Sequence, residues 1–262
     1  MSMHLLSEGR ALAFLREADL TAGPCIFVHV PKTAGTSLRA ELAAILPPDV
    51  NIHVDYTDTT RSFRERIDEA VERFLDQAGP GGIRFASGHI VARHVARIAE
   101  RLPDARFITM LRDPVARVIS DYRHQRSPRQ PGFEAFRQRV PDLDAYLALR
   151  WEMDKSALHL VPQEILARGD TAAAIQHVAR RFAFVGIQEM YDLSFRAITA
   201  LAGRQQAPQI RANVNMDEDG TDAVDAATAA RIRALNPMDT ALYDHFAEAL
   251  RTATPALRAV LG

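Results

Sequence analysis

Cysteine and lysine are the scarce residues of this chain. Its 262 residues include one cysteine, Cys25, and two lysines, Lys32 and Lys155, so arginine supplies 30 of the 32 basic side chains. A single cysteine excludes an intramolecular disulfide and any zinc site built from several cysteines. Because arginine supplies nearly all the other basic side chains, each lysine is a candidate position where a compact ammonium is needed rather than a planar guanidinium.

Long apolar runs are absent and neither charge dominates. No run reaches eighteen apolar residues, and residues 1–19 mix charged with apolar side chains, so the sequence predicts neither a membrane span nor a signal peptide. The net charge of -1 argues against binding nucleic acid by bulk charge. With 47% apolar and 25% charged residues the composition is that of a globular protein. We expect a single cytoplasmic domain over 1–262, with an N-terminal helical segment at 1–24 and a binding core at 25–262.

Apolar runs alternate with segments of helical period. Strands are expected at 25–30, 51–56, 83–87, 105–111 and 182–187. Helices are expected at 36–46, 61–77, 92–102, 115–125, 193–202, 222–235 and 237–251, with a helix-rich middle. This alternation predicts an α/β fold with a largely parallel central sheet flanked by helices. Ligands bind beyond the carboxyl ends of such strands, which here means after Val30, Ser87 and Leu111.

The segment after the first strand has the composition of an anion-binding loop. It consists of Pro31, Lys32, Thr33, Ala34, Gly35, Thr36 and Ser37. Between a strand and a helix, backbone N–H groups and the helix N-terminus form a site for phosphate, to which the hydroxyls and Lys32 would add. The nucleotide-hydrolase pattern G-x-x-x-x-G-K-[ST] is absent, because Ile26 and Pro31 replace its two glycines. The alternative is a solvated turn capped by Thr36.

A second candidate element follows the strand at 105–111. Arg112 stands at the strand end, Pro114 opens a helix, and Ser120 lies on that helix. Arg112 and Ser120 would converge on a second phosphate if the turn folds back. Two alternatives remain open: Asp113 has the position of a magnesium-binding acid, and Arg112 would also suit a simple pair with a neighbouring carboxylate.

These two elements resemble those of sulfotransferases that use 3′-phosphoadenosine 5′-phosphosulfate (PAPS). The stretch 32–37 is similar to their 5′-phosphosulfate loop, and Arg112-Asp-Pro with Arg117, Ser120 and Tyr122 is similar to their 3′-phosphate element. Weaker similarities to the uronyl 2-O-sulfotransferase branch lie at 51–57, 85–90, 184–189 and 213–215. That branch often has His-Gly-His where this chain has Ser87-Gly88-His89, so only the second histidine carries over.

The resemblance implies a role for each of these residues. Lys32 would act on the bridging oxygen of the phosphosulfate, and Arg112 with Ser120 would bind the 3′-phosphate. The 5′-phosphate would be bound by Thr33, Ala34, Gly35, Thr36 and Ser37. Arg211 and Asn215, in a polar segment that also holds Asn213, would lie near the nucleotide, although a simple surface loop is the alternative.

His89 is the candidate base for the acceptor hydroxyl. It follows a strand, and its ordinary pKa near ~6.5 suits proton transfer, although histidines at such positions are often structural. His53 and Asp55 end another strand and would orient the substrate, unless they form an exposed pair. Arg123 lies in the basic run 122–129, which suits an anionic acceptor such as a uronic-acid sugar and equally suits a solvated helix face.

These features together predict a sulfotransferase that moves a sulfuryl group from PAPS to a hydroxyl of a carbohydrate or other small acceptor, with PAP as product. No metal is expected, since H-E-x-x-H is missing. Lys155 is expected to pair with Glu152, three residues earlier on a helix. The alternatives are a P-loop kinase that uses magnesium-ATP and a catalytically silent nucleotide-binding module.

Overall fold

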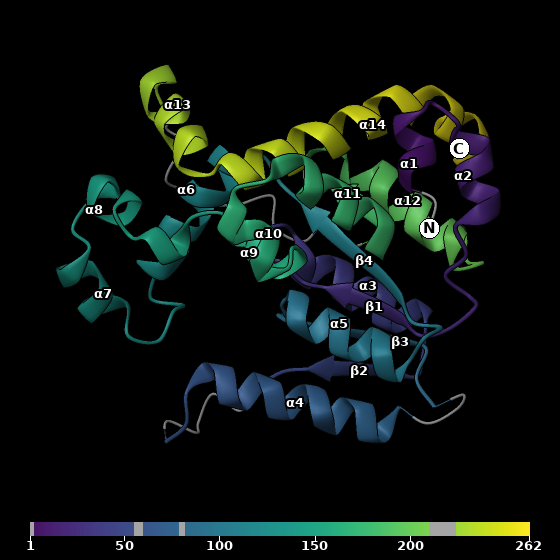
Figure 1. Cartoon of the computed structure of the whole chain (residues 1–262), viewed down its shortest axis with the longest axis horizontal. Coiled ribbons are helices and arrows are strands. Elements are labelled where there is room, and N and C mark those ends of the chain that lie inside the picture. The colour runs from purple at the N-terminus through teal and green to yellow at the C-terminus, as the bar shows by residue number, and fades with distance from the viewer. Residues whose placement is uncertain (1–2, 55–59, 79–81, 210–223) are drawn as a thin grey trace.

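A parallel five-stranded sheet organises the chain. The computed structural model describes residues 3–54, 60–78, 82–209 and 224–262. The strands lie in the order β2-β3-β1-β4-β5, and all their pairings are parallel (Figure 1). They are β1 Cys25–Val28, β2 Asp49–Ile52, β3 Phe85–Gly88, β4 Arg106–Leu111 and β5 Phe182–Ile187. The predicted fold, a single domain with a parallel sheet flanked by helices, is confirmed.

The central strands consist of continuous apolar runs because both faces of the sheet are covered. Every residue of β1, β3 and β5 is buried, whereas the edge strand β2 buries only Ile52. Residues buried on both sides cannot alternate with polar ones, which is why these strands lack a period of two.

Helices surround the sheet and fill the long connection between β4 and β5. Before β4 the helices are α1 Met3–Ser7, α2 Ala11–Glu17, α3 Gly35–Ile45, α4 Phe63–Gln77 and α5 Ala92–Arg101. After β4 come α6 Pro114–Gln125, α7 Phe133–Arg139, α8 Leu143–Leu147, η1 Arg150–Glu152, α9 Lys155–Leu160, α10 Gln163–Arg168 and α11 Thr171–Arg181. After β5 come η2 Gln188–Met190, α12 Tyr191–Leu201, α13 Ala226–Leu235 and α14 Pro237–Leu261. In the described part of the chain, no helix has both the length and the apolar character needed to cross a membrane.

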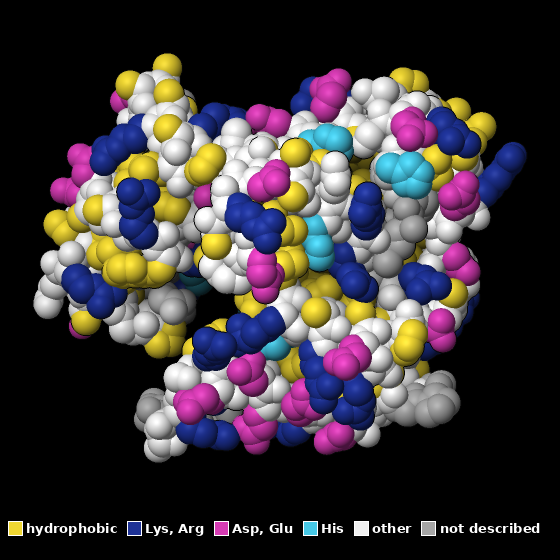
Figure 2. All heavy atoms as spheres, viewed as in Figure 1, with side chains coloured by type: hydrophobic (Ala, Val, Ile, Leu, Met, Phe, Trp, Pro, Cys, Tyr) yellow, Lys and Arg dark blue, Asp and Glu magenta, His cyan; other side chains and the backbone are white. Residues whose placement is uncertain are grey.

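A small lobe stands apart from the main body on the side toward which the strands point. It contains α7 and α8 (Figure 1), and its own apolar cluster includes Val140, Tyr146 and Leu147 packed with Val118 of α6. The space-filling view shows the surface hollowed between this lobe and the part of the body formed by α4 and α5 (Figure 2). The carboxyl ends of the strands point toward the side of the molecule where this hollow lies.

Several element boundaries differ from the expectations, most of them by one or two residues. β1 ends at Val28 rather than Val30, because the chain turns after the His29 N–H has bonded to the Gly88 carbonyl at 2.9 Å. β2 begins and ends earlier than predicted, at Asp49 and Ile52. The last helix runs to Leu261 instead of ending near 251, since its apolar face continues through buried Leu257 and Leu261 despite a proline at 255.

Candidate active site at the strand ends

The loop after β1 has a strained backbone and an uncapped helix behind it. Lys32 and Ala34 both adopt left-handed conformations, with φ of 69° and 61°. Such residues cost about 1–3 kcal/mol each and are concentrated at functional sites. Thr33 is buried, and its hydroxyl donates to the Val30 carbonyl at 2.8 Å, which fixes the turn. α3 follows with Ala34 as N-cap and without a side-chain cap, so the expected alternative of a Thr36-capped turn is wrong.

The N–H groups of a helix start have no partners within the helix and can form an anion site, and α3 begins directly after this loop. Of the two hydroxyl residues on the first turn of α3, Ser37 is buried and Thr36 is exposed. Lys32 is half-buried at the mouth of the loop. This arrangement can bind a phosphate-like group through backbone N–H groups, hydroxyls and one ammonium.

His29 is a site residue that the sequence analysis did not identify. Its ring lies directly on Gly35, where an added Cβ would come within 2.0 Å of His29 Cδ2. The same ring lies with its centre 5.3 Å from that of Phe27 and 4.1 Å from that of His89. Burial, together with the neighbouring His89 and His159, lowers the pKa of His29 to about 2. A histidine at the end of an apolar strand run was the available signal.

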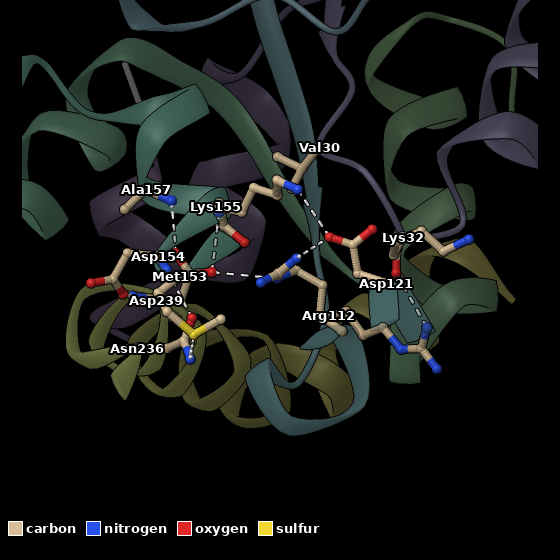
Figure 3. A network of polar contacts seen from close by, with 12 residues as sticks. Val30, Lys32, Arg112, Asp121, Met153, Asp154, Lys155, Ala157, Asn236 and Asp239 are labelled. Atoms are coloured by element: carbon tan, nitrogen blue, oxygen red, sulfur yellow. Dashed lines mark hydrogen bonds and ion pairs between the residues drawn. The ribbon is translucent and has the colours of Figure 1, made fainter. Parts of the chain in front are cut away.

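The second predicted element reaches the first loop. Arg112, half-buried after β4, donates from Nη1 to the Lys32 carbonyl at 3.2 Å (Figure 3). Burial lowers the pKa of Arg112, but a guanidinium stays charged at neutral pH. Ser120 lies half-buried further along α6. Parallel strand ends thus bring two cationic elements to one edge of the sheet.

Asp113 has a structural task. Its carboxylate caps α6 by accepting the backbone N–H groups of Val115 at 2.9 Å and Ala116 at 3.0 Å, and it also pairs with Arg233 of α13. These contacts occupy the group that would otherwise suit a magnesium ion. No cluster of His, Cys, Asp and Glu suited to a metal occurs among the described residues.

His89 follows β3 and has a defined tautomer. Its Nδ1 donates to the His29 carbonyl at 2.7 Å, so Nε2 of the neutral ring carries the free lone pair. Burial lowers the pKa of His89; the bond to His29 opposes this effect, and the charge of Lys155 adds to it. The ring is therefore neutral near pH 7, which is the state that a proton acceptor requires.

Two further polar groups lie near His89. His159 of α9 is buried and donates from Nδ1 to the Ile90 carbonyl at 2.7 Å, and burial lowers its pKa to about 3. Ser87 is buried in β3, and its hydroxyl has no hydrogen-bond partner within the described ranges. Ser87 is two residues before His89, and His159 is bonded to the carbonyl of the next residue, Ile90, so the end of β3 concentrates polar groups inside an apolar layer.

The structure describes two of the remaining predicted site residues, and the others lie in segments outside the described residues. His53 is exposed after β2, and its Nδ1 donates to the Asn51 carbonyl of its own strand at 2.9 Å. Arg123 is half-buried on α6 beside His124, whose pKa is lowered by burial and by the charge of Lys32. Asp55, Arg211, Asn213 and Asn215 lie outside the described residues.

A buried charge network connects α6, α9 and α14. Arg117 is wholly buried, with Nη1 3.6 Å from Asp121 and Nε 3.5 Å from Asp239. Asp239 of α14 also accepts the backbone N–H groups that begin α9, those of Ser156 at 3.1 Å and Ala157 at 2.8 Å. Asp154, before α9, in turn accepts the Asp239 N–H at 2.9 Å, so the two helix starts cap each other (Figure 3).

Lys155 joins this network on its exposed side. Its ammonium contacts Asp121 at 3.0 Å (Figure 3), and it also pairs with Glu152 as the sequence predicted. Burial opposes the ionisation of Asp121, but Lys155 and Arg117 outweigh it and lower the pKa of that carboxyl group. The network is thus a fixed set of charges beside the strand ends.

Comparison with known proteins gives one family match. The Sulfotransferase family matches residues 90–174, a stretch that includes Arg112 and Ser120 but not the loop at 31–37. No curated protein matches the chain. Among solved structures, a sulfotransferase from Alicyclobacillus acidocaldarius is 17% identical, covering 90% of this chain and 96% of that one, with a TM-score of 0.46. Mouse sulfotransferase SULT7A1 complexed with PAP is 16% identical, covering 88% of this chain and 71% of that one, with a TM-score of 0.40.

Proposed function

We propose that this chain is a sulfotransferase that moves a sulfuryl group from PAPS to a hydroxyl of a carbohydrate or other small acceptor. The observation that carries the proposal is the bond from Arg112 to the Lys32 carbonyl, which joins two anion-binding elements at one edge of the sheet. PAPS has two anionic groups on one nucleoside, and two adjoining cationic elements suit such a molecule. The family match over residues 90–174 supports the same assignment.

The residues present fit the donor. The strained loop and the start of α3 would bind the 5′-phosphosulfate through N–H groups and through the side chains of Thr33, Thr36 and Ser37. Arg112, with Ser120, would bind the 3′-phosphate, and Arg211 and Asn215 are proposed to contact the nucleotide. When bound, PAPS supplies an activated sulfuryl group.

The transfer then depends on charge and position. Lys32 would stabilise negative charge on the bridging oxygen as the bond breaks. His89 Nε2 would accept the acceptor's hydroxyl proton, because Nδ1 is already committed to the His29 carbonyl. In-line transfer needs no metal if these cations provide the stabilisation.

An anionic acceptor suits the hollow beside the strand ends. Arg123 is half-buried on α6 in the basic run, next to His124, whose pKa the charge of Lys32 lowers. A carboxylated sugar approaching this side would be attracted by those charges. His53 and Asp55 are further candidates for substrate contact.

A kinase is the rival function, and one observation disfavours it. The acid that would hold magnesium, Asp113, already caps α6 and pairs with Arg233. The glycine pattern of nucleotide hydrolases is also missing. A silent nucleotide-binding module would share the donor site but lack turnover.

Thermal unfolding with different nucleotides separates these functions. PAP at 100 times its dissociation constant should stabilise the chain by about 2.7 kcal/mol, which raises the melting temperature by several degrees. ADP, or ATP with magnesium, should have little effect. Stabilisation by magnesium-ATP alone would refute the proposal.

Turnover of PAPS then distinguishes an enzyme from a silent module. With an acceptor panel of carboxylated and neutral sugars, the wild-type chain should release PAP. Replacing His89 with Asn should lower the rate by roughly 100-fold while PAP still binds. His245→Asn on α14, whose ring contacts the Ser7 hydroxyl, is the matched control. Equal rates for the His89→Asn and wild-type proteins would remove His89 from the mechanism.

A further inference from the structure

The second lysine of the chain is clamped at the rear of the proposed site. The Lys155 ammonium lies between the carboxylates of Asp121 and Glu152, and the three side chains are 21%, 5% and 10% exposed. Asp121 is itself held by the Tyr146 hydroxyl at 3.1 Å and by Arg117. The carboxylates are therefore fixed more deeply than the ammonium, which keeps its remaining side toward the surface.

α9 carries Lys155 on the same face as a histidine that contacts the residue after His89. Lys155 and His159 are four residues apart on α9 and therefore share a helix face, with Cβ atoms about 5–6 Å apart. His159 is bonded to the Ile90 carbonyl, next to His89 in the chain. Lys155 lies one turn back along this face of α9, and its charge lowers the pKa of both His89 and His159.

Lysine chemistry suits a group that has both a clamp and a ligand. An ammonium has three N–H donors, and here two directions are taken by the carboxylates of Asp121 and Glu152. The third donor is the one that a ligand would use. An arginine would instead use two parallel N–H groups on one carboxylate, which leaves no single compact charge between the two carboxylates.

We propose that Lys155 is the second cation of the transfer site, held beside His89 to contact the sulfuryl group on the side away from Lys32. The proposal rests on the proposed sulfotransferase function and adds a residue to it. Negative charge on the sulfuryl oxygens would then be stabilised by cations from two different elements, the loop after β1 and the start of α9.

A dead-end complex tests this contact without any acceptor. Inorganic sulfate, titrated by calorimetry into protein saturated with PAP, occupies the place of the transferred group. Replacing Lys155 with Met should weaken sulfate binding about tenfold while PAP alone binds within about twofold of the wild-type protein. Equal sulfate affinity in the two proteins would overturn the proposal.

Matched variants separate contact from folding. Lys155→Met leaves two buried carboxylates without their cation, so the double variant Lys155→Met with Glu152→Gln restores part of the charge balance if the single variant unfolds. Arg251→Met, which removes an exposed cation paired with Glu248 on α14, is the control for loss of charge alone. It should leave sulfate affinity unchanged; an equal loss in this variant would overturn a specific role for Lys155.

The titration of His89 provides a readout independent of nucleotide. The groups that face His89 are His29 from the end of β1 and, from α9, His159 and Lys155. Removing the ammonium should raise the pKa of His89, measured by NMR of the ring, by about half a unit or more. An unchanged titration in the Lys155→Met protein would refute the placement beside His89.

Failure of the proposed function would give a different result from failure of the proposal on Lys155. A wild-type protein that does not bind PAP would refute sulfotransfer from PAPS. The His89 titration, together with sulfate titrated into the free protein, then decides the proposal on Lys155 by the same criteria.

Discussion

Acidification should destabilise this protein through two buried histidines. Burial lowers the pKa of His29 to about 2 and of His159 to about 3, so neither folded ring binds a proton above pH 5. In the unfolded chain both have a pKa near ~6.5. Because the unfolded state then binds more protons as the pH falls, stability from these groups is complete above about pH 6.5 and declines below it.

The magnitude follows from the unfolded pKa alone. Between about pH 7.5 and pH 5.5 each histidine of the unfolded chain takes up most of a proton. This uptake stabilises the unfolded state by ~1.4 kcal/mol per histidine, since the folded rings stay neutral. His29 and His159 together should therefore lower the free energy of unfolding by about 2.7 kcal/mol over this range. The exact folded values do not enter, because both lie far below the lower pH.

Urea denaturation of a matched pair of variants isolates this contribution from that of the carboxylates. In His159→Asn the side-chain amide can still donate to the Ile90 carbonyl, but the group no longer titrates. The loss of stability between the two pH values should shrink by about 1.4 kcal/mol relative to the wild-type protein. His53→Asn, at an exposed position, should leave it unchanged within about 0.5 kcal/mol. A His159→Asn protein with the wild-type pH dependence would refute the reasoning.

Three substitutions test other parts of the site. Gly35→Ala places a methyl group against His29 and should cost about 1–3 kcal/mol of unfolding free energy in urea, with part of the loss recovered when His29→Ala is added; no recovery would contradict the contact. Arg112→Gln should weaken PAP binding at least about tenfold in calorimetry but leave adenosine 5′-phosphate, which lacks the 3′-phosphate, unaffected; equal losses would remove the 3′-phosphate assignment. Arg117→Leu strands two buried carboxylates and should cost about 3–5 kcal/mol, against less than about 1 kcal/mol for the exposed Arg251→Leu; similar costs would show that the buried network does not depend on its arginine.

The sheet was predictable because its signal is local. Strands buried on both faces require apolar runs, and the helices between them have their own period, so the sequence predicts a parallel α/β fold without any knowledge of contacts. The convergence of the loop at 31–37 with Arg112 follows from the same fact, since parallel strand ends meet at one edge. The boundary errors arose where a polar turn interrupts an apolar run, as after Val28.

The contacts around His89 were not predictable, because they join residues far apart in the chain. His29 looks like part of a strand in the sequence, and only the pairing of β1 with β3 brings its carbonyl to His89. His159 is read from its sequence as an ordinary residue of an apolar helix. Its role depends on Ile90, 69 positions away, and no spacing rule reports such a contact.

Lys155 shows where local reasoning is correct but incomplete. The spacing to Glu152 predicts a surface pair, a type of contact that stabilises a helix by only a few tenths of a kcal/mol. The contact with Asp121, from α6, converts that pair into a buried three-group cluster in which the ammonium is fixed between two carboxylates. A chain that uses arginine for 30 of its 32 cations has lysine at two places, one in the anion-binding loop and one in this cluster. In the proposed function both lysines supply a single compact charge to the ligand, a role for which a planar guanidinium is less suited.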